Sequence, residues 1–374
     1  MNTICLVCCA GYPNFGDEVI CRAWIRRLLA TTKFEIIVEC PIPANAKILF
    51  GKHERISYQD MLWRYVWSSP QSDIIASIMY GLEIEDQLTS VNCSLEFMFS
   101  RIQKCKAIIF LGGGYIRDGW INHFSLIGIA MHLKRKYEIP IIMTGQSFMP
   151  WNEDSENLLM ACLSQFDHIS VRDHYSEEKV SKLNCFYGNC ICDDTFLEEN
   201  PLGGDKDFCR EDKKRILICL QTDIENKKIT DYLFFHINYL VSECKRTVYL
   251  LEFCPKWDLK YIKLLKAICH NTHIVKFADL FQNRFTVNRQ DICIGTRYHF
   301  HLLCARQGAW GIFGSPDMYY GYKHDSLLDI GSRWENVDLW HNMSPSPESP
   351  SIKETCLVEK KRKEFDIIIG LLNQ

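Results

Sequence analysis

The chain has 374 residues, 47% of them hydrophobic and 24% charged, which is enough for about two globular domains with cores of their own. Its 43 Lys and Arg residues against 46 Asp and Glu residues give a formal net charge of −3, so it lacks the basic excess typical of nucleic-acid-binding proteins. Aromatic residues make up 12%, and the Gly and Pro residues follow no period, which excludes disordered, collagen-like and coiled-coil proteins.

The sequence gives no sign of export or of a membrane span. No apolar run reaches the roughly 18 residues that a span needs, and the first residues, MNTICLVCCAGYP, lack the basic flank and cleavage site of a signal peptide. The 19 cysteines are an odd number and lie mostly within apolar runs, so we expect reduced core residues rather than disulfides or a metal site. We therefore expect a cytoplasmic protein.

Short apolar runs alternate with segments of helical period, which is typical of parallel sheets flanked by helices. In the first half this pattern predicts helices at 18–30, 124–137 and 155–165 and strands at 3–9, 34–39, 107–111, 140–144 and 168–171. In the second half it predicts strands at 215–220, 247–253, 273–276, 291–294 and 309–313. The fold class is therefore α/β, with two Rossmann-like doubly wound domains and a cleft between them.

The domains are expected at 1–200 and 215–352, joined by a polar, Gly-rich linker at 201–214. Residues 353–374 predict a terminal helix with Leu357, Phe365, Ile368 and Leu372 facing inward and the charged run EKKRKE forming a solvated face. A second interpretation has this run contact a membrane surface. The aromatic residues of 63–67 likewise either touch lipid or fill the core: Trp63, Tyr65 and Trp67.

Two glycine-containing motifs follow strands in the first half. The first, GYPNFGDE at 11–18, lacks the spacing of a dinucleotide-binding turn, and its Asp17 and Glu18 would repel a pyrophosphate. Asp17 either caps the next helix or contacts a sugar hydroxyl. The second motif, GGGYIRD, begins with Gly112, Gly113 and Gly114, which let a ligand approach the backbone and are expected to offer free amides.

Basic residues follow three further strands. Arg172 in SVRDHYS can fork onto a carboxylate or phosphate, or pair with an acid as part of the structure. Arg297 and His299, at the start of an amphipathic helix, suit an anionic substrate that exchanges a proton, whereas His301 packs or faces solvent. Lys323 and the tyrosines near it close over an anion or a sugar, or pack as core.

Taken in order, these motifs resemble the polysaccharide pyruvyl transferase family from about residue 11 to residue 323. The matching segments are GYPNFGDE, GGGYIRD, GQSFMP, SVRDHYS, DDTF, TRYHFHLLCARQG and YYGYK. The strongest is Arg297-x-His299 before an apolar helix. Tyr298 replaces the family's small apolar residue and His301 is unusual, which puts the choice of acceptor in doubt.

The resemblance implies a GT-B-like fold and a reaction that needs no metal and no cofactor beyond phosphoenolpyruvate as co-substrate. The pyruvyl group of phosphoenolpyruvate would be moved onto two hydroxyls of a sugar, forming a cyclic ketal and releasing phosphate. The donor would lie on Arg172, Arg297, Tyr298, His299 and Lys323, with His299 as the acid. The acceptor would face Asp17, Glu18 and Gly112 to Gly114.

The implied acceptor belongs to a surface or capsular polysaccharide precursor, such as galactose or N-acetylmannosamine on a lipid or nucleotide carrier. Beyond that, we expect no nucleic acid partner and at most peripheral contact with the inner face of the membrane. Two alternatives stay open: a GT-B glycosyltransferase that uses a nucleotide sugar, and a catalytically silent relative that binds glycan.

Overall fold

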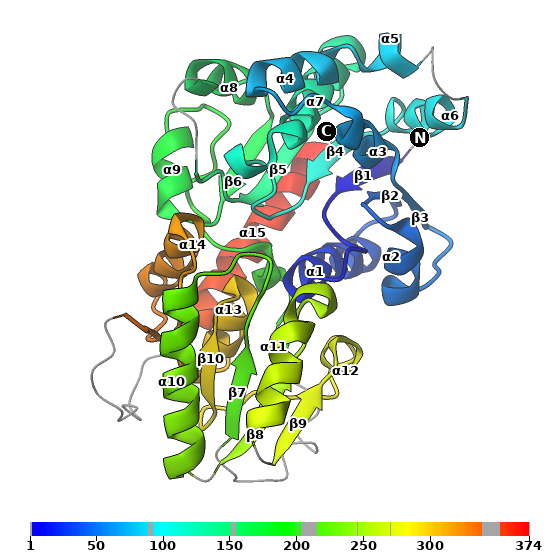
Figure 1. The fold of residues 1–374 in the computed structure, drawn as a ribbon. Coiled ribbons are helices and arrows are strands. Elements are labelled where there is room, and N and C mark those ends of the chain that lie inside the picture. The colour runs from blue at the N-terminus through cyan, green and yellow to red at the C-terminus, as the bar shows by residue number, and fades with distance from the viewer. Residues whose placement is uncertain are drawn as a thin grey trace. The chain divides into compact units, whose positions relative to one another are not determined.

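The computed structural model describes residues 2–88, 93–150, 155–199, 201–202, 215–244, 246–269, 271–338 and 352–373. It divides into two compact units (Figure 1). The first unit comprises Met1–Tyr12, Ile20–Leu197 and Leu357–Gln374, and the second comprises Pro13–Val19 and Glu198–Cys356. Most of the expected linker, from 203 to 214, lies outside the described residues.

The first unit contains a six-stranded sheet in the order β3-β2-β1-β4-β5-β6, with all neighbouring strands parallel. Its strands are β1 (Thr3–Val7), β2 (Glu35–Glu39), β3 (Ile56–Gln59), β4 (Ala107–Phe110), β5 (Ile141–Gln146) and β6 (His168–Val171). This is the strand order of a doubly wound Rossmann sheet. The sequence predicted five of these strands but not β3, whose residues are only partly buried.

Helices cover both faces of this sheet because the side chains of its central strand alternate between two cores. On β1, Cys5 and Val7 join one apolar cluster, while Ile4 and Leu6 join the other. The helices are α1 (Phe15–Thr31), α2 (Pro43–Phe50), α3 (Met61–Ser68), α4 (Ile74–Leu82), α5 (Ile84–Leu88), α6 (Cys93–Ile102), α7 (Ser125–Tyr137), α8 (Glu156–Leu163) and α9 (His174–Val180), with 3₁₀ turns η1 (Asp118–Phe124) and η3 (Asp194–Leu197).

The second unit contains another parallel six-stranded sheet, in the order β12-β11-β10-β7-β8-β9. Its strands are β7 (Arg215–Cys219), β8 (Thr247–Leu251), β9 (Thr272–Val275), β10 (Ile292–Gly295), β11 (Trp310–Phe313) and β12 (Glu335–Asn336). Its helices are α10 (Lys227–Cys244), α11 (Pro255–Ile268), α12 (Phe277–Phe281), α13 (Tyr298–Arg306) and α14 (Met318–Asp329). Apolar side chains of α10 and α11 pack on this sheet, and Figure 1 shows both helices beside its strands. The predicted pair of doubly wound α/β sheets is therefore confirmed.

The last helix, α15 (Glu354–Leu372), is drawn in red in Figure 1. Its residues Phe365, Ile368 and Leu372 join the core of the first unit, and Leu357 is buried too, as the sequence predicted. The predicted solvated face was wrong for two residues of the charged run, because Lys361 and Glu364 are each 1% exposed.

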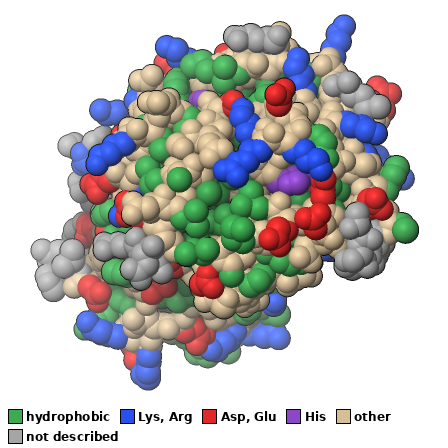
Figure 2. Space-filling model, turned by 90° about the horizontal axis from the view of Figure 1, so that it is seen from above, with side chains coloured by type: hydrophobic (Ala, Val, Ile, Leu, Met, Phe, Trp, Pro, Cys, Tyr) green, Lys and Arg blue, Asp and Glu red, His purple; other side chains and the backbone are tan. Residues whose placement is uncertain are grey.

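The aromatic residues near α3 mostly fill the core. Trp63 and Tyr65 are buried, whereas Trp67 is 52% exposed. Within the described part of the chain, no helix combines the length and the apolar character needed to cross a membrane. Basic and acidic side chains are interspersed on the face that Figure 2 shows, in line with the near-neutral net charge.

Helices α4 and α7 cross closely because each has a glycine at the contact. A Cβ atom on Gly128 would lie 2.0 Å from the Ile78 carbonyl oxygen, and one on Gly81 would lie 2.1 Å from the Ser125 carbonyl oxygen. Both neighbours are backbone atoms of the facing helix. The helices would therefore have to separate to admit even a methyl group.

We expect Gly128→Ala to lower the free energy of unfolding by about 1–3 kcal/mol through overpacking. Gly370→Ala in α15 is the matched control, since a Cβ atom there meets nothing within 4 Å; it should stabilise the protein by roughly 0.4–1 kcal/mol. Urea unfolding of the two variants tests the contact. Equal stability of Gly128→Ala and the wild type would show that the helices do not cross this closely.

Candidate functional site

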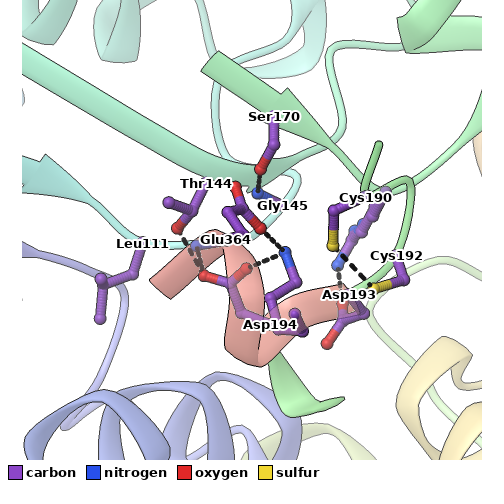
Figure 3. Close-up of polar contacts among 12 residues, drawn as sticks. Leu111, Thr144, Gly145, Ser170, Cys190, Cys192, Asp193, Asp194 and Glu364 are labelled. Atoms are coloured by element: carbon purple, nitrogen blue, oxygen red, sulfur yellow. Dashed lines mark hydrogen bonds and ion pairs between the residues drawn. The ribbon is translucent and has the colours of Figure 1, made fainter. Parts of the chain in front are cut away.

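In the first unit, residues of β5 and of the loop after β4 converge on the carboxylate of Asp194 (Figure 3). Its Oδ2 atom accepts hydrogen bonds from the Gly112 amide at 3.0 Å, the Thr144 hydroxyl at 2.6 Å and the Trp24 indole at 2.9 Å. Gly145 has φ +53°, and a Cβ atom on it would lie 2.5 Å from Asp194 Oδ1. Glycine is therefore required there to make room for the carboxylate.

The glycine loop of 112–114 is held by this network. The Gly112 amide is bonded to Asp194, and the Gly113 amide donates to the Gly145 carbonyl oxygen at 3.3 Å. The expectation that this loop offers free amides was therefore wrong for Gly112 and Gly113. A contact between Gly112, Gly113 or Gly114 and the acceptor stays a prediction.

Lys361 of α15 completes the network from the other side. Its ammonium group lies 2.9 Å from Asp194 Oδ1 and 2.7 Å from Glu364 Oε2, and Glu364 also meets His168 Nε2 at 2.9 Å. Burial alone raises the pKa of Glu364, but Lys361 and His168 together lower it to about 2. The buried charges are thus compensated by ion pairs, as burial of such groups requires.

Arg172, which follows β6, is buried and paired with Asp193. Its Nη1 atom lies 2.8 Å from Asp193 Oδ2, and the two side chains are 2% and 1% exposed. Of the two interpretations the sequence left open for Arg172, this ion pair corresponds to the structural one. The next residue, Asp173, caps α9 by accepting a hydrogen bond from the Ser176 amide.

In the second unit, the candidate site forms around Arg297, directly after β10 and before α13. Its Nε and Nη2 atoms lie 2.7 Å from Asp258 Oδ1, and Nη2 lies 3.3 Å from Asp223 Oδ1. Burial alone would lower the pKa of Arg297, but the two carboxylates raise it above its ordinary value, so the guanidinium stays charged. These pairs engage the Nε and Nη2 atoms of the guanidinium.

His299 lies one residue further along, in the first turn of α13, and is 8% exposed. It packs against the start of α1 so closely that a Cβ atom on Gly16 would lie 1.8 Å from its Nδ1 atom. The Phe15 amide donates to the Phe253 carbonyl oxygen at 2.8 Å, which holds this segment on the second unit. Gly16 is therefore needed for His299 to occupy its position.

The acidic residues of the same segment are also placed in the second unit. Asp17 accepts a hydrogen bond from the Asn14 amide group at 2.8 Å, and Glu18 is fully buried. The sequence expected both of them to lie on an acceptor side formed by the N-terminal domain. In the structure they belong to the segment that packs against His299.

Lys323 of α14 lies among three buried tyrosines. Its Nζ atom is 3.9 Å from the ring centroid of Tyr319, 5.0 Å from that of Tyr320 and 5.8 Å from that of Tyr298. Such contacts attract a cation through the negative faces of the rings. Asp317 fixes the start of α14 by accepting a hydrogen bond from the Tyr320 amide. Because Tyr298 is the residue after Arg297, the ammonium group lies near the start of α13.

His301 is buried and packs against neighbouring rings, which is the first of the two possibilities that the sequence left open. Its Nδ1 atom meets His324 Nδ1 at 2.9 Å and its Nε2 atom meets the Ser332 hydroxyl at 2.6 Å, while His324 Nε2 meets the Thr296 carbonyl oxygen at 3.2 Å. Burial lowers the pKa of His324 to about 3, so both rings are neutral at pH 7. This chain of bonds fixes α13 against α14.

Sequence reasoning missed the partners of the basic residues. Asp223 follows β7 at the same sheet edge as Arg297, and that position was the available signal. Asp258 lies inside α11, and Lys361 and Glu364 lie inside a charged run, so no local pattern marks them as buried. Among the described residues, no group of three or more His, Cys, Asp or Glu side chains is placed to hold a metal ion.

The buried carboxylate of Glu364 predicts a pH dependence of stability. Its pKa in the folded protein, about 2, is below the ordinary value of 4.5, so its contribution is complete above pH 4.5 and is lost as the pH falls toward 2. Glu364→Gln should lower the free energy of unfolding at pH 7 by on the order of 3 kcal/mol. It should also flatten the loss between pH 4.5 and 2.

Glu359→Gln, at an exposed position of the same helix, is the control and should change neither quantity. Denaturant unfolding at several pH values measures both effects. An acid profile of Glu364→Gln identical to that of the wild type would contradict the ion-pair network.

The comparisons with solved structures concern the fold. UDP-GlcNAc 2-epimerase of Methanocaldococcus jannaschii, in complex with UDP-GlcNAc and UDP, superimposes with a TM-score of 0.54 at 10% identity, covering 98% of this chain and 99% of that one. The Neisseria meningitidis enzyme bound to UDP-GlcNAc gives a TM-score of 0.52 at 10% identity, with coverages of 97% and 91%. These likenesses confirm the predicted GT-B-like pair of Rossmann-like domains.

A search of curated proteins finds no significant match to this sequence. A family model described as polysaccharide pyruvyl transferase matches residues 14–313. That range includes every motif described above except Lys323 and the first residues of the GYPNFGDE segment. Because the match covers most of the chain, the protein belongs to the polysaccharide pyruvyl transferase family.

Proposed function

We propose that the protein transfers the pyruvyl group of phosphoenolpyruvate onto two hydroxyls of a sugar in a surface or capsular polysaccharide precursor. The observation that carries the proposal is the set of Arg297, His299 and Lys323 in one unit of a pyruvyl transferase family member. Two fixed cations beside an imidazole suit a small anion that must gain a proton.

The donor would lie against the guanidinium of Arg297 and the ammonium of Lys323. Phosphoenolpyruvate carries a carboxylate and a phosphoryl group, so two separate cations can each take one end of it. Asp258 holds Arg297 through Nε and Nη2, which supports a role for Nη1 as the donor-facing nitrogen. Tyr298 would line the same site through its contact with Lys323.

The reaction would begin with transfer of a proton from His299 to the methylene carbon of phosphoenolpyruvate. The central carbon then becomes electrophilic, and a sugar hydroxyl adds to it with loss of its own proton. Departure of phosphate regenerates an electrophilic centre, which the second hydroxyl attacks, again losing a proton. One proton is gained at carbon and one by the phosphate, and two leave the hydroxyls, so the protons balance.

The acceptor residues are proposed from their positions in the structure. Asp17 lies in the segment next to His299, so its carboxylate is the candidate to take a hydroxyl proton, with Glu18 beside it in sequence. Arg172 is proposed as a further donor-binding residue, with Asp193 holding its guanidinium in place through Nη1 as Asp258 holds that of Arg297. Gly112 to Gly114 remain candidates to face the sugar. The acceptor proposed is a galactose or N-acetylmannosamine unit on a lipid or nucleotide carrier.

The proposed cellular location of the reaction follows from its donor, phosphoenolpyruvate. Phosphoenolpyruvate is a cytoplasmic metabolite, so we propose that the protein acts in the cytoplasm. A lipid-linked acceptor would bring it to the inner face of the membrane, where Trp67 is one of the exposed aromatic side chains that could make peripheral contact. No cofactor or metal is part of the proposed mechanism.

Calorimetric titration of phosphoenolpyruvate, UDP and a UDP-sugar, each with and without a candidate sugar, tests the donor. We expect phosphoenolpyruvate to bind the wild type, and Arg297→Gln to lose that binding. Because Arg297→Gln leaves the buried Asp258 unpaired, it should also unfold more easily, by about 3–5 kcal/mol. Arg297→Gln with Asp258→Asn is the matched control, which should recover stability but not binding.

Recovery of phosphoenolpyruvate binding in the double variant would show that Arg297 acts only through folding. Binding of UDP and of the UDP-sugar, with none of phosphoenolpyruvate under any condition, would refute pyruvyl transfer and favour a glycosyltransferase.

His299→Gln tests the proposed acid. It should still bind phosphoenolpyruvate within a fewfold of the wild type, because the charge-assisted contacts remain. Phosphate release in the presence of the sugar should fall by about 10²–10⁴-fold, the usual contribution of a general acid. If His299→Gln weakened the binding of phosphoenolpyruvate but left phosphate release from the bound donor unchanged, His299 would instead be a binding residue.

A further inference from the structure

Gln221 is a buried polar side chain whose amide forms no hydrogen bond of ordinary geometry with the described residues. It lies just after β7 and is 2% exposed, yet neither its Nε2 nor its Oε1 atom forms a hydrogen bond with any described residue. Folded proteins leave few buried polar groups unsatisfied, because such a group loses its bonds to water without replacing them. An amide that is unsatisfied in the free protein is therefore suited to receive a ligand.

The surroundings of Gln221 are those of the candidate site. Its backbone amide donates to the Thr296 hydroxyl at 3.0 Å, and Thr296 precedes Arg297. The Tyr320 phenol lies close to the Gln221 side chain and interacts with it, although the two do not meet hydrogen-bond geometry. Tyr320 is in turn one of the rings around Lys323. Gln221 is thus linked to Arg297 through Thr296 and to Lys323 through Tyr320.

A second unsatisfied group lies on the other side of Arg297. Strand β10, which leads to Arg297, has β7 and β11 as its neighbours in the sheet. Gln221 follows β7, and Ser315 follows β11 with a buried hydroxyl that forms no hydrogen bond within the described residues. Two polar groups without partners therefore flank the residue on which the proposed function depends. This arrangement is expected at the carboxyl edge of a parallel sheet that binds a ligand.

The charges in this region explain why an uncharged hydrogen-bond donor is useful beside Arg297. Asp258 and Asp223 already balance the charge of Arg297, so a ligand with several negative charges needs further hydrogen-bond donors. A carboxamide supplies two N–H groups without adding a charge that would have to be compensated in the free protein.

We propose that Gln221 is a specificity-determining residue, whose amide donates a hydrogen bond to an anionic oxygen of phosphoenolpyruvate. The inference rests on the proposed function, because it takes phosphoenolpyruvate as the occupant of this site. The oxygen belongs either to the carboxylate or to the phosphoryl group of the donor.

The test compares Gln221→Met, which keeps the approximate length and removes the amide, with Gln290→Met at an exposed position of the same unit. Calorimetry measures the Kd for phosphoenolpyruvate, and thermal unfolding measures Tm. We expect Gln221→Met to raise the Kd by about tenfold or more, as loss of a hydrogen bond to a charged group does. Its Tm should equal or exceed that of the wild type, because a buried unsatisfied amide has been removed. Gln290→Met should change neither.

An unchanged Kd in Gln221→Met, or a fall in Tm together with the weakened binding, would overturn the assignment, since the second result is what a structural role predicts. Competition by inorganic phosphate and by pyruvate identifies which group of phosphoenolpyruvate Gln221 contacts, because only the competitor that carries this group should bind more weakly to the variant than to the wild type. If neither competitor binds more weakly to the variant, the contact is refuted. Failure of the wild type itself to bind phosphoenolpyruvate would refute the proposed function, an outcome distinct from a variant that binds as well as the wild type.

Discussion

The buried ion pair of Arg297 with Asp258 is the interaction on which the candidate site depends. A guanidinium can be held at 7% exposure only if its charge is compensated, and Asp258 and Asp223 provide that compensation. The pair also fixes the orientation of the guanidinium fork before any ligand arrives. Because Arg297 is the residue before α13, the same pair sets the start of the helix that carries His299.

The first unit also contains a buried ion pair, but there the pair connects parts of the fold. There the buried carboxylate is Asp194, its cation is Lys361, and a glycine makes room for it as Gly16 does for His299. The network joins a loop after β4 to the last helix of the chain through Asp194, which is 167 positions from Lys361. Its hydrogen bonds and ion pairs occupy the amide of Gly112 and the charges of Asp194 and Lys361. The network therefore stabilises the fold of the first unit, whereas in the second unit the buried side chains of Gln221 and Ser315 form no hydrogen bonds with the described residues.

The sequence predicted the architecture well because apolar periodicity reports burial directly. Ten of the twelve strands follow from short apolar runs, but β3 and β12 do not, since these two strands contain polar residues and are only partly buried. Of the site, Arg297 and His299 could be found from their position after a strand. Asp258 could not, because a carboxylate within a helix resembles any solvated residue until the tertiary contact is known. Lys361 was misjudged for the same reason, as local composition carries no information on a partner 167 positions away.

The central claim is that the central carbon of phosphoenolpyruvate becomes the ketal carbon after its methylene is protonated. Reaction with a galactose or N-acetylmannosamine saccharide in D₂O, followed by NMR of the product and by phosphate release, tests it most directly. The account predicts a pyruvate ketal whose methyl group carries one solvent deuterium, with one phosphate released for each ketal. A ketal methyl group without deuterium would contradict protonation at carbon, and glycosyl transfer from a nucleotide sugar without consumption of phosphoenolpyruvate would contradict the account as a whole.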